Sequence, residues 1–156
     1  MRLQEQAGQA LIETALSSFI FLLLLMGVVE CGHLFSTQLT LQNAVRQAGR
    51  YAITGSCIQS SGGSCSMSRY NSVVQTLEGA STGLLNGSNL ADVTIACTNN
   101  GGGCPNNAGG PGDTVSISVA YPYQFVTPLM GALFGGSYTI KVSAAFVNEP
   151  FSPSQS

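Results

Sequence analysis

The sequence predicts an α+β fold in which a long amino-terminal helix, membrane-spanning in its first half, packs on a small antiparallel sheet domain. Three observations support this fold class. An apolar run occupies residues 11–29, apolar residues continue at helical spacing to about residue 52, and three segments with strand character follow. The second half of the helix and one face of the sheet are expected to bury their apolar side chains against each other.

The apolar run predicts one membrane-spanning helix, which we place at residues 9–30. About 20 apolar residues match a hydrocarbon core of about 30 Å at a rise of about 1.5 Å per residue. A cleavable signal peptide is the alternative, but the run is long for one and no A-x-A-like site follows it. A lipoprotein acylated on Cys31 is disfavoured, because Glu30 stands where a small residue is expected.

The helix is expected to continue through residues 31–55, beyond the membrane segment. Apolar side chains recur there at the spacing of a helix with one buried face. Thr54 and Gly55 supply a stop signal, so a single helix of about 65 Å is predicted over residues 10–53. The apolar stripe consists of Leu34, Leu41, Val45, Ala48 and Ala52.

Residues 56–148 are expected to form the α+β domain, and residues 149–156 a flexible tail. A loop rich in Ser and Gly opens the domain. A second helix is then predicted over residues 68–85, because apolar residues recur there at helical spacing. Strands are predicted at residues 91–97, 114–121 and 138–147, and the second of them alternates most clearly between apolar and polar side chains.

Four of the five cysteines predict disulfide bonds in an oxidising space such as the bacterial periplasm. Local pairing, of Cys57 with Cys65 and of Cys97 with Cys104, is the simplest of the three connectivities. Each closed loop would stabilise the fold by about 2.5 kcal/mol in the chain-entropy model. Cys31 is left over, and we interpret it as a small apolar residue near the membrane boundary, with palmitoylation and an intermolecular disulfide as alternatives.

Composition and motifs exclude several classes of function. Charged residues make up 8% of the chain, and its five basic residues form no patch that would bind nucleic acid. A single histidine, His33, and cysteines without C-x-x-C spacing predict no metal site. The glycine-rich residues 98–113 lack the lysine of a phosphate-binding loop and are expected to be flexible and exposed. We therefore expect no catalytic residue, no cofactor and no enzymatic activity.

The amino-terminal stretch "GQALIE", residues 8–13, resembles the processing site of type IV prepilins and pseudopilins. In those proteins a hydrophilic leader ends in glycine, and the fifth mature residue is a glutamate at the head of an apolar helix. Here the leader is residues 1–8, the new amino terminus is Gln9 and the fifth residue is Glu13. The sequence is similar to the TadE-like branch in particular, whose later pattern is matched by Asn43, Ala44, Arg46, Arg50, Tyr51 and Ala52.

A second stretch, residues 115–148, is similar to the carboxyl-terminal part of the same family. It contains a strand, a turn with a Tyr-Pro-aromatic sequence, an apolar patch and a last strand. Family members often carry a Met-Arg pair near the end, and Phe146 and Val147 replace it here. The resemblance therefore covers both ends of the chain and leaves the middle without a counterpart.

The resemblance implies that a prepilin peptidase cleaves between Gly8 and Gln9. It also implies that Glu13 pairs with the freed amine of a neighbouring subunit and favours one axial register, because an unpaired charge is expensive in a low-dielectric bundle. The function that follows is that of a TadE-like minor pilin or pseudopilin. Such a protein takes part in assembly of a tight-adherence pilus and supports adhesion and biofilm formation.

The resemblance further implies a single-pass protein of the bacterial inner membrane with its carboxyl-terminal domain in the periplasm. Its partners would be prepilin peptidase, other pilins or pseudopilins and the tight-adherence assembly machinery, and it would enter a cell-surface pilus or assist its assembly. The alternative is an uncleaved, membrane-anchored periplasmic scaffolding or binding domain. An exported hydrolase is a third class, for which the sequence offers no catalytic residues.

Overall fold

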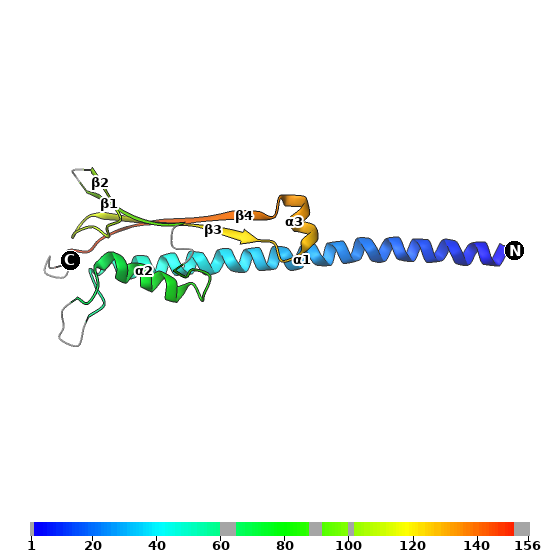
Figure 1. The fold of residues 1–156 in the computed structure, drawn as a ribbon, viewed down its shortest axis with the longest axis horizontal. Coiled ribbons are helices and arrows are strands. Elements are labelled where there is room, and N and C mark those ends of the chain that lie inside the picture. The colour runs from blue at the N-terminus through cyan, green and yellow to red at the C-terminus, as the bar shows by residue number, and fades with distance from the viewer. Residues whose placement is uncertain (1, 60–64, 88–91, 100–101, 152–156) are drawn as a thin grey trace. The chain divides into compact units, whose positions relative to one another are not determined.

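The computed structural model describes residues 2–59, 65–87, 92–99 and 102–151, and it shows the predicted α+β fold (Figure 1). The chain divides into two compact units. The amino-terminal unit comprises Met1–Phe35 and Gln124–Tyr138, and the sheet unit comprises Ser36–Tyr123 and Thr139–Ser156. The elements in chain order are α1 (Arg2–Ile53), α2 (Arg69–Ala80), β1 (Val93–Asn99), β2 (Gly102–Pro105), β3 (Thr114–Gln124), α3 (Pro128–Phe134) and β4 (Ser137–Val147).

Helix α1 ends at Ile53 as predicted, but it begins at Arg2 rather than at residue 10. The described part of the expected leader is therefore helical. At the other end, Gly55 adopts a φ of 68°, and its amide donates to the Ala52 carbonyl over 3.2 Å, which closes the helix.

Helix α1 also has the length and composition of a membrane anchor. Its apolar part, within Gly8–Ile53, contains an 18-residue window with a mean hydropathy of 2.2, none of it buried. Among the described residues this is the one helix that is long and apolar enough to cross a membrane. Large apolar side chains of this part are exposed, as expected for a surface that lipid or neighbouring helices cover.

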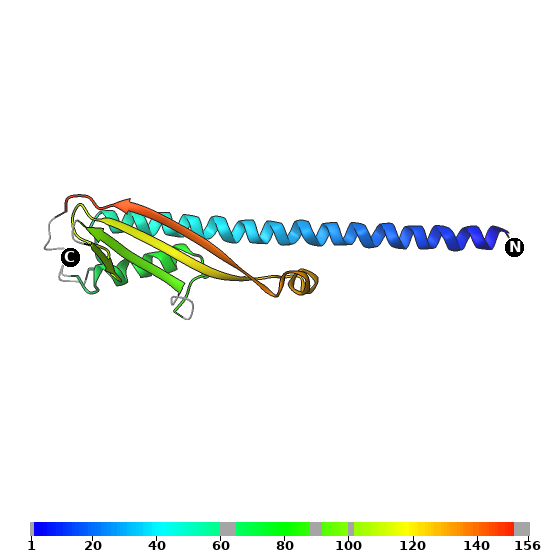
Figure 2. The same cartoon turned by 90° about the horizontal axis from the view of Figure 1, so that it is seen from above.

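The sheet unit has two layers, with the sheet on one side and the carboxyl-terminal half of α1 beside α2 on the other (Figures 1 and 2). The sheet is antiparallel in the order β2-β1-β3-β4, and Ile95 of β1 pairs with Ile117 of β3. The predicted alternation of β3 is confirmed, because Val115, Ile117 and Val119 are buried. The core consists mainly of Leu41, Val45, Ala48, Ala52, Val73, Leu77, Val93, Ile95, Val115, Ile117, Val119 and Ile140.

The second helix is shorter than predicted, because it ends at Ala80 rather than at residue 85. Thr82 and Gly83 follow with φ values of 52° and 87°, a left-handed backbone that cannot continue the helix. Leu85 is nevertheless buried, through a turn in which its amide donates to the Ser81 hydroxyl over 3.0 Å. The predicted apolar spacing thus indicated the burial of Val73 and Leu77 correctly and the helix end wrongly, and it did not include Leu85.

Two elements were not predicted, namely strand β2 and helix α3. Residues 98–113, expected to be a flexible exposed loop, contain β2, which pairs with β1 in a hairpin. Residues 100–101 of this segment lie outside the described residues, as do residue 91 of the first predicted strand and residues 152–156 of the predicted tail. Strand β1 runs to Asn99, two residues beyond the predicted end, and β3 runs to Gln124, three beyond it.

Candidate functional site

The residues of the expected processing site lie near the start of α1. Gly8, Gln9 and Glu13 are all exposed, and they share one face of the helix with Ile12 and Leu16. A Cβ built on Gly8 meets no atom within 4 Å. Packing among the described residues therefore does not require a glycine at this position.

The peptide bond between Gly8 and Gln9 lies inside the helix. A protease cleft binds its substrate in an extended conformation, so this part of α1 would have to unwind locally before cleavage. Glycine lowers the free energy of that step, since it disfavours helix by about 1 kcal/mol relative to alanine. The residue at position 8 therefore weakens the helix where a peptidase would have to open it.

A second acidic residue, Glu30, lies just beyond the apolar run and is buried, with 3% of its surface exposed. One carboxylate oxygen, Oε1, accepts a hydrogen bond from the amide of Val126 over 3.0 Å. The other, Oε2, accepts from the Thr127 amide over 3.0 Å and from the Thr127 hydroxyl over 2.9 Å. Both oxygens thus act as acceptors, which is the hydrogen bonding of an ionised carboxylate.

The position of Glu30 directly after the apolar run carries a signal that we interpreted too narrowly. We used it only as an argument against acylation of Cys31, although a charged residue directly after an apolar run marks a place where the helix needs polar partners. Its partners are 96 and 97 residues away in the chain. No local pattern links residues so far apart, so the pairing itself was not predictable.

An apolar groove of about 560 Å³ adjoins Glu30 within the amino-terminal unit. The rings of Phe125 and Phe134 lie on its wall with their centroids 5.8 Å apart. Helix α3 contacts α1 closely here, because a Cβ on Gly27 would stand 3.7 Å from Cε of Met130. The groove is lined by Glu30, Cys31, Leu34, Phe35, Phe125, Met130, Phe134 and Tyr138.

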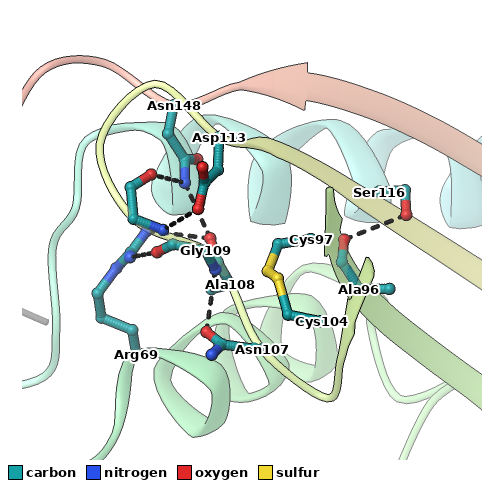
Figure 3. The surroundings of a disulfide bond; sticks show 11 residues. Arg69, Ala96, Cys97, Cys104, Asn107, Ala108, Gly109, Asp113, Ser116 and Asn148 are labelled. Carbon is teal, nitrogen blue, oxygen red and sulfur yellow. Dashed lines mark hydrogen bonds between the residues drawn. A yellow bond between two sulfur atoms is a disulfide. The ribbon is translucent and has the colours of Figure 1, made fainter. Parts of the chain in front are cut away.

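In the sheet unit, the buried Arg69 joins several segments of backbone (Figure 3). Its guanidinium donates to the carbonyl oxygens of Gly109 and, over 2.9 Å, of Ala52 at the carboxyl end of α1. The Phe151 ring covers it, with 4.5 Å between Cζ and the ring centroid. Burial lowers the pKa of the Arg69 side chain, but arginine still keeps its charge at neutral pH. A cation at this position also offsets the negative end of the α1 dipole.

The loop that follows β2 is held by a second set of hydrogen bonds (Figure 3). The Asn148 side-chain amide donates to the carbonyls of Ala108 and Gly110, each over 2.9 Å. A carboxylate oxygen of Asp113 accepts from the Gly110 amide over 2.7 Å. This network uses the polar residues of the segment to hold backbone, so it indicates a structural role.

Two disulfides complete the sheet unit, Cys57 with Cys65 and Cys97 with Cys104, with Cα–Cα distances of 5.6 and 4.9 Å. The second joins directly paired residues of β1 and β2 (Figure 3). Cys31 is free and exposed. Across the described ranges, no group of three or more His, Cys, Asp or Glu side chains is placed to hold a metal ion.

Comparison with known proteins finds one family match, in the helical part of the chain. Residues 8–50 match the model of the family described as TadE-like protein. The matched segment includes Gly8, Gln9 and Glu13, and it ends three residues before the end of α1. This is a structural, non-enzymatic pilin family associated with the Tad pilus. No curated protein and no solved structure matches the chain.

Proposed function

We propose that this chain is a TadE-like minor pilin or pseudopilin that takes part in assembly of a tight-adherence pilus and supports adhesion and biofilm formation. The main support is the family match over residues 8–50, which begins at Gly8, the glycine of the expected processing site. The chain would be anchored in the bacterial inner membrane by α1, with the sheet unit in the periplasm. Its work would be interaction with other pilins and the assembly machinery, not catalysis.

Processing by a prepilin peptidase between Gly8 and Gln9 is the first step of this proposal. Gly8 supports it because the glycine is exposed and no neighbouring atom of the chain excludes a side chain there. Replacing Gly8 with a bulky residue should therefore leave the fold intact and act on recognition by the peptidase and on the local unwinding that cleavage requires. Gly32 offers a matched control, since it lies on the same helix and a Cβ there also meets nothing within 4 Å.

The test is the intact mass of the chain purified from a host that has its peptidase. The parent and Gly32→Leu are expected to begin at Gln9, whereas Gly8→Leu should keep Met1. A parent chain that also keeps Met1 would favour the uncleaved, membrane-anchored scaffold. A start at or just after Cys31 would indicate a secreted protein instead.

Glu13 would set the register between subunits after processing. Its side chain is exposed and lies on the same helical face as Gln9, whose amine would become the chain terminus. In a bundle of apolar helices an unpaired carboxylate is expensive, while a pair of opposite charges recovers much of the cost. Subunits whose amine and carboxylate meet would therefore associate in preference to those displaced along the axis.

Glu13→Ala is expected to be processed and inserted normally but to be lost from filaments. Thr14→Ala is the matched control, since Thr14 is exposed next to Glu13 and its hydroxyl donates to the Ala10 carbonyl of its own helix, over 2.8 Å. The measurement is the amount of each variant in sheared pili relative to the membrane fraction. Equal incorporation of Glu13→Ala and Thr14→Ala would remove Glu13 from the proposal.

A further inference from the structure

We propose that Gln124–Tyr138, here called the α3 lobe, is an interfacial membrane anchor that lies in the boundary layer of the bilayer at the Glu30 end of the apolar run. The occupant of its apolar surface would be the acyl chains and headgroups of the same bilayer that α1 crosses. The proposal rests on the anchoring of α1 that the proposed function assumes. It requires neither cleavage at Gly8 nor entry into a filament.

The first step is the position of the lobe along α1. The hydrogen bonds of Glu30 to Val126 and Thr127 fix the lobe at the turn where the apolar run ends. The contact between Met130 and Gly27 brings α3 back to the level of the run itself. A run over residues 11–29 spans about 28 Å, close to the hydrocarbon thickness of about 30 Å, so the lobe lies at the depth of the interface.

The second step is the chemistry of the lobe. Its fifteen residues include no Asp, Glu, Lys or Arg. Large apolar or aromatic side chains nevertheless face outward, and Phe134 is 66% exposed. Tyrosine, here Tyr138, is enriched at membrane interfaces, where one end of its side chain is apolar and the other is hydrated. The exposed large apolar or aromatic side chains of the lobe are Val126, Leu129, Phe134 and Tyr138.

The third step is continuity with the membrane helix. Val28 and Val29 are exposed on α1 next to the lobe, so lipid that covers them would reach the lobe as well. The lobe also donates backbone and hydroxyl hydrogen bonds to Glu30, which keeps a carboxylate satisfied at a depth where water is scarce. A lipid surface therefore accounts both for the outward apolar side chains and for the buried Glu30.

The test uses the absence of tryptophan from the sequence. Phe134→Trp in the full chain supplies a single fluorophore on the lobe, and Leu129→Trp supplies a second. Val147→Trp is the matched control, since Val147 is 64% exposed and belongs to the sheet unit. Phe19→Trp, in the middle of the apolar run, reports full contact with lipid. Each variant is reconstituted in phosphatidylcholine vesicles with and without bromine on the acyl chains, and its mass is recorded.

We expect bromine to quench Phe19→Trp, Phe134→Trp and Leu129→Trp, and to quench Val147→Trp much less. Lobe fluorescence quenched no more than that of Val147→Trp would overturn the proposal. A second result would also overturn it: bromine does not quench the lobe tryptophans, and their emission wavelength shifts with the protein-to-lipid ratio. Such a result would mean that a second copy of the chain, and not lipid, covers the lobe. If the chain keeps Met1 and still shows the expected quenching, the proposed cleavage after Gly8 is refuted but the proposed position of the lobe is not. The two proposals can therefore be refuted independently.

Discussion

Removal of the Glu30 carboxylate should open the α3 lobe without unfolding the sheet unit. In Glu30→Ala the two donors of Thr127 lose their buried acceptor, and the Val126 amide loses one at a partly buried site. A buried donor left without a partner costs about 1–3 kcal/mol, so the two Thr127 donors together destabilise the closed lobe by about 2–6 kcal/mol. At about 1.4 kcal/mol per factor of ten, the opening equilibrium should rise at least about 30-fold.

The assay is amide hydrogen exchange of the full chain in lipid vesicles, read at Val126 and Thr127. Glu30→Gln should lose less protection than Glu30→Ala, because its remaining oxygen can still accept from Thr127 and only the partly buried Val126 amide loses its acceptor. Glu78→Ala, in the sheet unit, is the control and should leave both amides unchanged. Unchanged protection of Thr127 in Glu30→Ala would refute the reasoning, since it would mean that the carboxylate does not hold the lobe.

Two further predictions concern the sheet unit. Gly49→Ala should lower the free energy of unfolding by about 1–3 kcal/mol, because its Cβ would overlap the Phe146 ring, whereas Gly79→Ala, at an open helical position, should raise it by up to about 1 kcal/mol. Urea denaturation measures both free energies of unfolding. Equal urea midpoints for Gly49→Ala and Gly79→Ala would show that the Phe146 ring moves aside freely. Arg69→Lys should destabilise by about 1–3 kcal/mol, since one ammonium cannot reach both the Ala52 and Gly109 carbonyls, and a parent-like urea midpoint would contradict this role.

Much of the helix and sheet architecture was predictable because its signals are local and long. The apolar run and the apolar stripe after it predicted the end of α1 at Ile53, and the alternation of apolar and polar residues predicted β3. The α3 segment carries no such signal, since it is a seven-residue helix that begins at a proline and ends at Gly135 with a φ of 80°. Its stability comes from Glu30 and the α1 surface, which are remote in the sequence.

The interior site around Arg69 was missed for a different physical reason. Sequence reasoning counted Arg69 only among five basic residues that form no nucleic-acid-binding patch, and its neighbours in the chain give no sign of burial. Its partners are backbone carbonyls of α1 and of the loop after β2, and every residue type supplies such a carbonyl. Side-chain patterns cannot reveal a site built from backbone, whereas the fold brings these segments together.

The shared helical face of Gly8, Gln9 and Glu13 has a consequence for a newly cut subunit. Cleavage after Gly8 would leave a free ammonium on Gln9 one helical turn from the carboxylate of the same chain. An intrahelical pair at this spacing contributes only about 0.2–0.5 kcal/mol, so thermal motion would open and close it readily. Until the subunit joins a filament, its own Glu13 carboxylate would therefore act as a weak counterion of the Gln9 ammonium. The carboxylate of a neighbouring subunit could readily displace it during assembly.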